Sequence, residues 1–158
     1  MKRILAMALL AFGAAGAAQA CPDWRLEAAA SYNLSGDQLR KAQGADVIAG
    51  GENYIWNCRG INPQSDQGAG YFTSNPDFRF FISDLERYQL VVSVISQCDS
   101  ALLINTQSAS WYYDDDDNGN LDPRIVLTRP ISGQIDVWVG TYDGEYCDAR
   151  LMLETFPR

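Results

Sequence analysis

The segment WYYDDDDNGNLDPRI, residues 111–125, carries the side chains with the clearest chemical potential in this chain. Asp, Asn and Gly alternate along it, and calcium takes about six to eight oxygen ligands of the kind that Asp and Asn supply. In the register of a calcium loop, the alternate positions are occupied by Asp114, Asp116, Asn118, Asn120 and Asp122. Gly119 then falls at the sixth position, where a sharp turn needs a residue that tolerates positive φ. The pattern predicts a structural calcium site.

The same segment departs from a helix-loop-helix calcium hand. Position twelve is Ile125, where that hand has a bidentate glutamate. The flanking residues are strand-like, so we expect the missing ligand to come from Asp143, Glu145 or water. The alternative is a solvated turn, because Asp, Asn and Gly also dominate turns for backbone reasons. Repulsion among adjacent carboxylates favours the bound cation.

Aromatic side chains lie beside the acidic segment and offer a second kind of site. Trp111 and Tyr113 precede the aspartates, and Trp138 lies in a later apolar run. Flat aromatic rings next to carboxylates are typical of a carbohydrate-binding face, so a carbohydrate-binding module is our alternative hypothesis. The competing interpretation is that these rings belong to the core, which large aromatics often fill in β-sandwiches.

The composition argues against an enzyme. The chain contains no histidine, so neither a Ser-His-Asp nor a Cys-His peptidase site can form within it. Adjacent aspartates on one turn cannot flank a glycosidic bond from opposite sides, as glycoside hydrolysis requires. We therefore expect a protein without catalytic residues.

The N-terminus has the features of a secretory signal peptide spanning residues 1–20. Lys2 and Arg3 precede an apolar run, and Ala18-Gln19-Ala20 forms a small-residue cleavage site. Removing Lys2 and Arg3 from 12 basic residues leaves 10 against 20 acidic ones, a net charge of −10. Nucleic acids and anionic membranes need a basic surface, so we expect neither as a partner. We expect a periplasmic or secreted product that binds a protein or a polysaccharide.

Four cysteines remain after cleavage, and an even number in an exported chain indicates two disulfides. Three pairings are possible. We favour Cys98–Cys147, because each of these residues begins an apolar run with a Cys-Asp pair, and this leaves Cys21–Cys58. Each bridge is expected to add about 2–4 kcal/mol of stability. A zinc site is disfavoured by the absence of histidine and of C-x-x-C spacing.

Short apolar runs with period two recur along residues 21–158 and predict a single all-β domain, an antiparallel, jelly-roll-like β-sandwich. Two sets of alternating residues are expected to face the core: Phe78, Phe80 and Ile82, and Ile135, Val137 and Val139. Residues 37–41 are compatible with one helical turn. Residues 59–70, rich in Gly, Pro, Asn and Ser, predict a long surface loop.

The order of features in residues 76–156 resembles the bacterial pre-peptidase C-terminal domain family. The matching runs are PDFRFFIS, YQLVVSVIS, ALLINTQSASWYYDDDD, PRIVLTRPISGQIDVWVGTY and ARLMLETF. The resemblance implies a non-catalytic β-sandwich of the kind appended to secreted proteases, and some members of the family bind calcium. On this basis we expect a stand-alone exported binding or accessory module.

Overall fold

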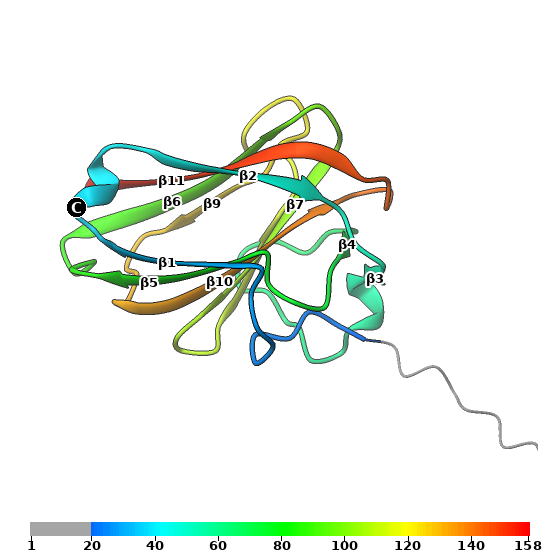
Figure 1. Cartoon of the computed structure of the whole chain (residues 1–158), viewed down its shortest axis with the longest axis horizontal. Helices are drawn as coiled ribbons and strands as arrows, with labels where there is room; N and C mark the ends of the chain where they lie inside the picture. Colours follow the sequence, from blue (N-terminus) through cyan, green and yellow to red (C-terminus); the bar gives the residue numbers. More distant parts are fainter. Residues whose placement is uncertain (1–19) are drawn as a thin grey trace, which may run out of the picture.

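The computed structural model describes residues 20–158, which form a two-layer β-sandwich (Figure 1). The predicted signal peptide lies outside these residues, except for Ala20. The strands are β1 (Ala30–Ser35), β2 (Gln43–Ala49), β3 (Asn53–Tyr54), β4 (Tyr71–Phe72), β5 (Phe78–Ser83), β6 (Tyr88–Ser96), β7 (Ser100–Thr106), β8 (Trp111–Asp114), β9 (Arg124–Leu127), β10 (Gly133–Thr141) and β11 (Cys147–Pro157). Two short 3₁₀ turns are η1 (Gln38–Arg40) and η2 (Ile55–Asn57).

The larger sheet, sheet A, is built around β10. This strand pairs with β5 and then β1 on one side and with β7 and then β8 on the other, while its C-terminal end also contacts β4, which pairs with β3. The smaller sheet, sheet B, has the order β2-β11-β6-β9. This arrangement confirms the predicted all-β sandwich. One detail differs, because β1 and β5 are parallel while the other named strand pairs are antiparallel.

The main core lies between the two sheets. The period-two prediction for β5 and β10 is confirmed, since all six predicted residues are buried there. Sheet B contributes the alternate side chains of β6 and β11, including Leu90, Val92 and Leu151. Burying one branched or aromatic side chain of this kind contributes about 1.5–3 kcal/mol, so this layer is the main source of stability.

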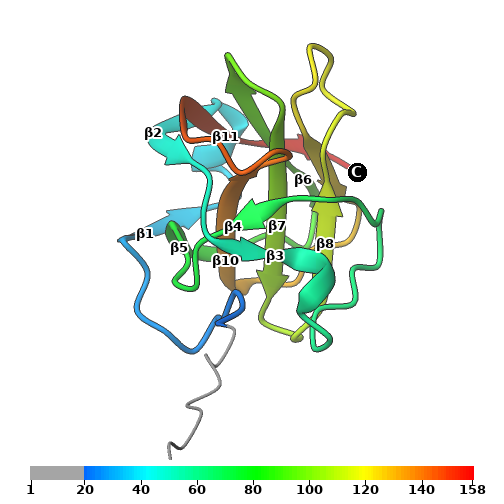
Figure 2. The same cartoon turned by 90° about the vertical axis from the view of Figure 1, so that its right-hand side faces the viewer.

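A second, smaller core covers the outer face of sheet A. Here Leu103 and Trp138 pack with Tyr113, Phe72 and Ile55. Figure 2 shows β3 and β4 crossing in front of β7 and β10, on the side away from sheet B. Every residue of β10 from Ile135 to Thr141 is buried, and so are most residues of β7; the second core covers the outer face of β10 at Trp138.

The segment 59–70 has no regular strand, as predicted, but it also covers part of sheet A. Ser65 Oγ accepts a hydrogen bond from Tyr113 N and donates one to Tyr113 O. The Tyr113 hydroxyl donates to the backbone oxygen of Ala69. The segment is therefore fastened over β8 rather than extended into solvent.

Both predicted disulfides form. Cys98–Cys147 joins the β6–β7 turn to the start of β11, with a Cα–Cα distance of 6.4 Å, and Cys21–Cys58 ties the N-terminal arm, residues 21–29, to the end of η2 at 5.7 Å. Two bridges of this kind form in an oxidising compartment, so the chain is an exported protein. In residues 20–158, neither helical turn has the length or apolarity that a membrane crossing requires.

Two further elements bear on the predictions. The expected helical turn at residues 37–41 is η1. Strands β1 and β8 were not predicted, because the sequences ASYNLS and WYYD contain few aliphatic residues. Strand β8 is recognisable only once its partner β7 is known, since its pairing with Leu102–Asn105 defines it.

Gly140 marks the place where β4 approaches β10, and it provides a test of the double burial. A Cβ atom at this position would lie 2.4 Å from Tyr71 O and 2.6 Å from the Phe72 ring. Gly140→Ala should therefore reduce the free energy of unfolding by about 1–3 kcal/mol, as overpacking usually does. Gly60→Ala is the matched control, because no atom lies within 4 Å of a Cβ placed there. Urea unfolding measures both, and equal stabilities would contradict this packing.

Candidate functional site

The acidic segment forms a compact carboxylate cluster at the end of β8. One oxygen from each of Asp114, Asp116 and Asp117 lies within 4.8 Å of the others. Asp114 is buried and the other two are exposed. The structure thus brings together two of the five predicted ligands, and adds Asp117, which the alternating register had left out.

Asp114 is the anchor of this cluster. Its Oδ2 accepts hydrogen bonds from Arg124 N at 2.7 Å and from Asp117 N at 3.2 Å, which close the turn between β8 and β9. Burial raises the pKa of Asp114 to about 6, and the neighbouring charges of Asp117 and Asp115 add to the rise. The two backbone hydrogen bonds act in the opposite direction, because they stabilise the charged form.

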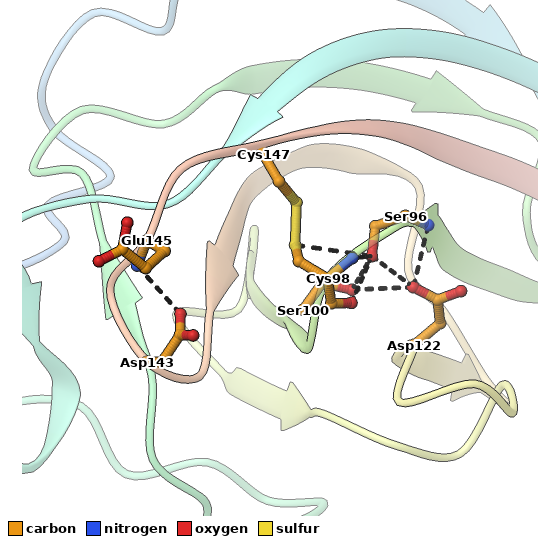
Figure 3. Close-up of a disulfide and its surroundings, with 7 residues drawn as sticks. All are labelled: Ser96, Cys98, Ser100, Asp122, Asp143, Glu145 and Cys147. Atoms are coloured by element: carbon orange, nitrogen blue, oxygen red, sulfur yellow. Dashed lines mark hydrogen bonds between the residues drawn. A yellow bond between two sulfur atoms is a disulfide. The ribbon is translucent and has the colours of Figure 1, made fainter.

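Asp122 has a different environment from the one that the calcium register predicts. It is buried, and its Oδ1 accepts hydrogen bonds from Ser96 N at 3.0 Å, Ser96 Oγ at 2.7 Å and Ser100 Oγ at 3.0 Å (Figure 3). This carboxylate therefore braces the β6–β7 turn beside the Cys98–Cys147 disulfide. The Asn118 amide nitrogen similarly donates to Val94 O, on β6.

The turn itself has the conformation expected from Gly119, which has a φ of +77°. Asn120 and Leu121 also have positive φ, at 54° and 60°, which the sequence did not indicate. Asn120 is exposed at the tip of the turn. The turn therefore has three consecutive left-handed residues, where the calcium-loop register required positive φ only at Gly119.

The two residues proposed as additional ligands lie in the β10–β11 turn. Asp143 Oδ1 accepts a hydrogen bond from Glu145 N at 3.0 Å. Figure 3 shows both on the other side of the disulfide from Asp122. Asp99 is affected by the charge of both regions. Burial raises its pKa, and the charges of Asp143 in one region and Asp116 in the other raise it further. The negative charge therefore extends beyond the three-carboxylate cluster.

The aromatic face predicted from Trp111, Tyr113 and Trp138 does not exist as a stacking surface. Tyr113 and Trp138 are 0% exposed, and Trp111 is half-buried with its ring centroid 5.4 Å from that of Trp138. The reason is the cover over sheet A, in which segment 59–70 and β3–β4 pack on these rings. Tyr113 and Trp138 are therefore core residues, as in the competing interpretation, and offer no exposed ring for a sugar.

A different pocket opens on the same outer face, where that cover ends. Its volume is 320 Å³, and we call it the sheet-A pocket. Its lining includes Trp24, Phe81, Asn105, Gln107, Gly133, Gln134 and Asp136. The sequence contained a signal for it, since Asp136 interrupts the apolar run GQIDVWVG and Asn105 interrupts ALLINT. Such interruptions are costly unless the polar group has a partner.

The floor of the sheet-A pocket is polar and buried. Asp136 on β10 and Asn105 on β7 are register partners, and they are 1% and 2% exposed. Asp136 accepts hydrogen bonds from Arg79 Nε at 2.6 Å and from Gln134 Nε2 at 2.7 Å, one on each oxygen. The Asn105 amide nitrogen has no hydrogen-bond partner among residues 20–158.

Comparison with known proteins does not assign a family to the chain. No protein-family model matches it, and no curated protein matches its sequence. Among solved structures, it is similar to PliG of Aeromonas hydrophila, a periplasmic inhibitor of g-type lysozyme. The TM-score is 0.44 and the identity 8%, over 80% of this chain and 97% of that one. The resemblance of residues 76–156 to pre-peptidase C-terminal domains stays a prediction.

The raised pKa of Asp114 predicts a pH-dependent stability. A folded-state pKa of about 6 lies above the ordinary aspartate value, so the folded chain holds this proton more tightly than the unfolded chain. Stability linked to Asp114 should therefore fall as the pH rises from about 4 to about 6. Asp114→Asn retains an acceptor for Arg124 N and carries no charge. The free energy of unfolding of this variant, relative to that of the wild type, should therefore increase by on the order of 2 kcal/mol as the pH rises from 4 to 7.5. Chemical unfolding in excess chelator measures this, and a pH-independent difference would contradict it.

Proposed function

We propose that the chain is an exported binding module without catalytic activity. The sheet-A pocket carries this proposal, because it combines buried polar groups with exposed aromatic ones on a rigid sheet. Ligand sites are typically concave, with aromatic walls and a few fixed polar groups. The floor of this pocket lies on the paired strands β7 and β10, so its polar groups are held in place before a ligand arrives.

Several properties of the acidic groups support the non-catalytic part of the proposal. Both oxygens of Asp136 already accept hydrogen bonds, from Arg79 and Gln134, so neither oxygen is free to act on a substrate. Asp114, Asp116 and Asp117 lie on one turn and cannot reach opposite faces of a substrate bond. The chain has no histidine to act as a general base near neutral pH.

The expected setting is the periplasm or the extracellular medium, and the expected partner is a protein or a polysaccharide. The charge of −10 for residues 21–158 disfavours binding to nucleic acids and anionic membranes. The resemblance of the second half to pre-peptidase C-terminal domains supports an accessory role. A stand-alone module of that type would act by attachment to its partner rather than by chemistry.

We also propose that the carboxylate cluster takes up calcium as a structural ion. Asp114, Asp116 and Asp117 offer three converging oxygens, and Asp115 lies beside them with a pKa raised by burial and by Asp116. A divalent cation would relieve this repulsion and stabilise the β8–β9 turn. Extracellular modules bind calcium with dissociation constants of about 10⁻⁴ to 10⁻³ M.

Thermal unfolding of oxidised residues 21–158 tests the calcium proposal. At a free calcium concentration about ten times the dissociation constant, binding should add roughly 1.4 kcal/mol, with a smaller effect of magnesium. The shift should disappear in Asp116→Ala and remain in Glu27→Gln, which removes a charge from the exposed N-terminal arm. No shift in the wild type, or a shift retained in Asp116→Ala, would rule out calcium at this turn.

Pull-down experiments test the binding function. Immobilised residues 21–158 should retain an exported protein or an insoluble polysaccharide saturably, without cleaving it. Phe81→Ala should reduce retention, because Phe81 is 43% exposed at the pocket. Ile95→Ala, which removes an exposed apolar side chain from the outer face of sheet B, should not. Turnover of a bound substrate, or equal loss in both variants, would contradict the proposal.

A further inference from the structure

We propose that the sheet-A pocket binds one ring of a neutral oligosaccharide. This inference rests on the binding function proposed above and specifies its ligand class and site. It places sugar recognition at residues other than Trp111, Tyr113 and Trp138, on a part of sheet A that stays open.

The pocket floor contains an unpartnered amide nitrogen. Asn105 is 2% exposed, yet its amide nitrogen donates to no atom of residues 20–158. Leaving a buried donor unpaired costs about 1–3 kcal/mol. An apolar residue would continue the run ALLI more favourably at this position on β7. A ligand acceptor, such as a sugar hydroxyl oxygen, would satisfy the donor.

The charges beside this amide are balanced. Asp136 is buried, but Arg79 neutralises it through the 2.6 Å contact, and Gln134 caps its second oxygen. The floor therefore presents dipoles rather than a net charge. This arrangement gives no advantage to an anionic or a cationic ligand, and it suits a neutral ligand rich in hydrogen-bonding groups.

Two exposed aromatic side chains line the pocket. Trp24 is 40% exposed and Phe81 is 43% exposed, and both line it. A pyranose ring has an apolar face of C–H groups and a periphery of hydroxyls, so it can pack a face on an aromatic ring while its hydroxyls bind amides. Exposed aromatics next to buried amides provide both kinds of contact.

The position of Trp24 is fixed by the rest of the fold. Arg79 Nη2 donates to the backbone oxygens of Trp24 and Leu26. Asp23 N donates to Ser74 O at 2.9 Å, and the Cys21–Cys58 disulfide holds the start of the arm. The same arginine thus neutralises the pocket floor and holds the backbone of an aromatic residue that lines the pocket.

The rim of the pocket adds further amide groups. Gln107 Oε1 accepts a hydrogen bond from Gln134 N at 3.1 Å, which leaves the Gln107 amide nitrogen as a donor near the opening. Gly133 permits this approach, because a Cβ there would lie 1.3 Å from Gln107 Oε1 and its φ is +142°. The volume of 320 Å³ is at the lower end of the range for ligand pockets, about 300–1,000 Å³. It corresponds to one ring, with the rest of an oligosaccharide outside.

Calorimetric titration with two neutral tetrasaccharides tests the inference on oxidised residues 21–158. Cellotetraose carries hydroxyls only, and chitotetraose also carries acetamido groups, so the pair distinguishes the two kinds of sugar. We expect at least one to bind. Trp24→Ala and Asn105→Val should each weaken binding by about tenfold or more, equivalent to 1.4 kcal/mol. Trp56→Ala, which removes a 56% exposed tryptophan from η2, should leave binding unchanged.

Thermal unfolding of Asn105→Val separates a ligand role from a structural one. Because the Asn105 amide nitrogen has no hydrogen-bond partner among residues 20–158, this variant should be as stable as the wild type or more stable. Loss of sugar binding with retained stability supports the proposal. Unfolding of Asn105→Val would indicate a structural role for the amide, and Trp24→Ala would then decide whether the pocket binds sugar.

Two results would overturn the inference. One is no heat of binding for either tetrasaccharide at millimolar concentration, and the other is binding that survives both pocket variants. The first can be separated from a failure of the proposed function. If Phe81→Ala still abolishes retention of an exported protein, the module binds at this pocket and only the sugar ligand is wrong. If the wild-type module also retains no exported protein and no polysaccharide, both proposals are wrong.

Discussion

The burial of β10 on both faces is the constraint on which the rest of this structure depends. Its inner face packs against sheet B, and that layer forms from simple alternation. Its outer face carries Trp138, which would be left in water unless other residues covered it. The N-terminal arm, β3–β4 and segment 59–70 are disposed around that face, and the Cys21–Cys58 bridge joins the arm to η2. The loops of this protein are therefore part of its core.

The cover ends where β10 changes from Trp138 to Asp136, and this boundary creates the pocket. A charged residue cannot be sealed under an apolar cover without a partner, so Arg79 comes in from β5 and makes an ion pair with it. Because Arg79 also binds the N-terminal arm, the boundary is fixed rather than frayed. The same sheet face thus provides a dry core at one end and a polar recess at the other.

The sequence predicted the features that depend on local patterns and left out those that depend on the second cover. Alternation of apolar residues identified the inward-facing residues of β5 and β10. The even number of cysteines in an exported chain indicated the disulfides, and Gly119 indicated a turn. The sequence left open whether Trp138 and Tyr113 face solvent or the core, because period two says which residues share a face, not whether that face is covered. The place of Asp117 in the carboxylate cluster and the hydrogen bond from Ser96 to Asp122 depend on the folded turn, and residue spacing alone did not indicate them. The recess at Asn105 and Asp136 depends on strands that meet only in the folded sheet.

The strand order also determines when this chain can fold. β2 has its ladder with the last strand, β11, where Gln43 pairs with Leu153, and β1 needs β5, where Ala30 pairs with Phe78. Strands near the N-terminus therefore pair with strands that are synthesised later. Topologies with such non-local pairing fold slowly. The N-terminal half has no complete sheet of its own before the C-terminal strand arrives. Both sheets can therefore be completed only after most of the chain has been synthesised, because β10 and β11, which lie inside them, are the last two strands.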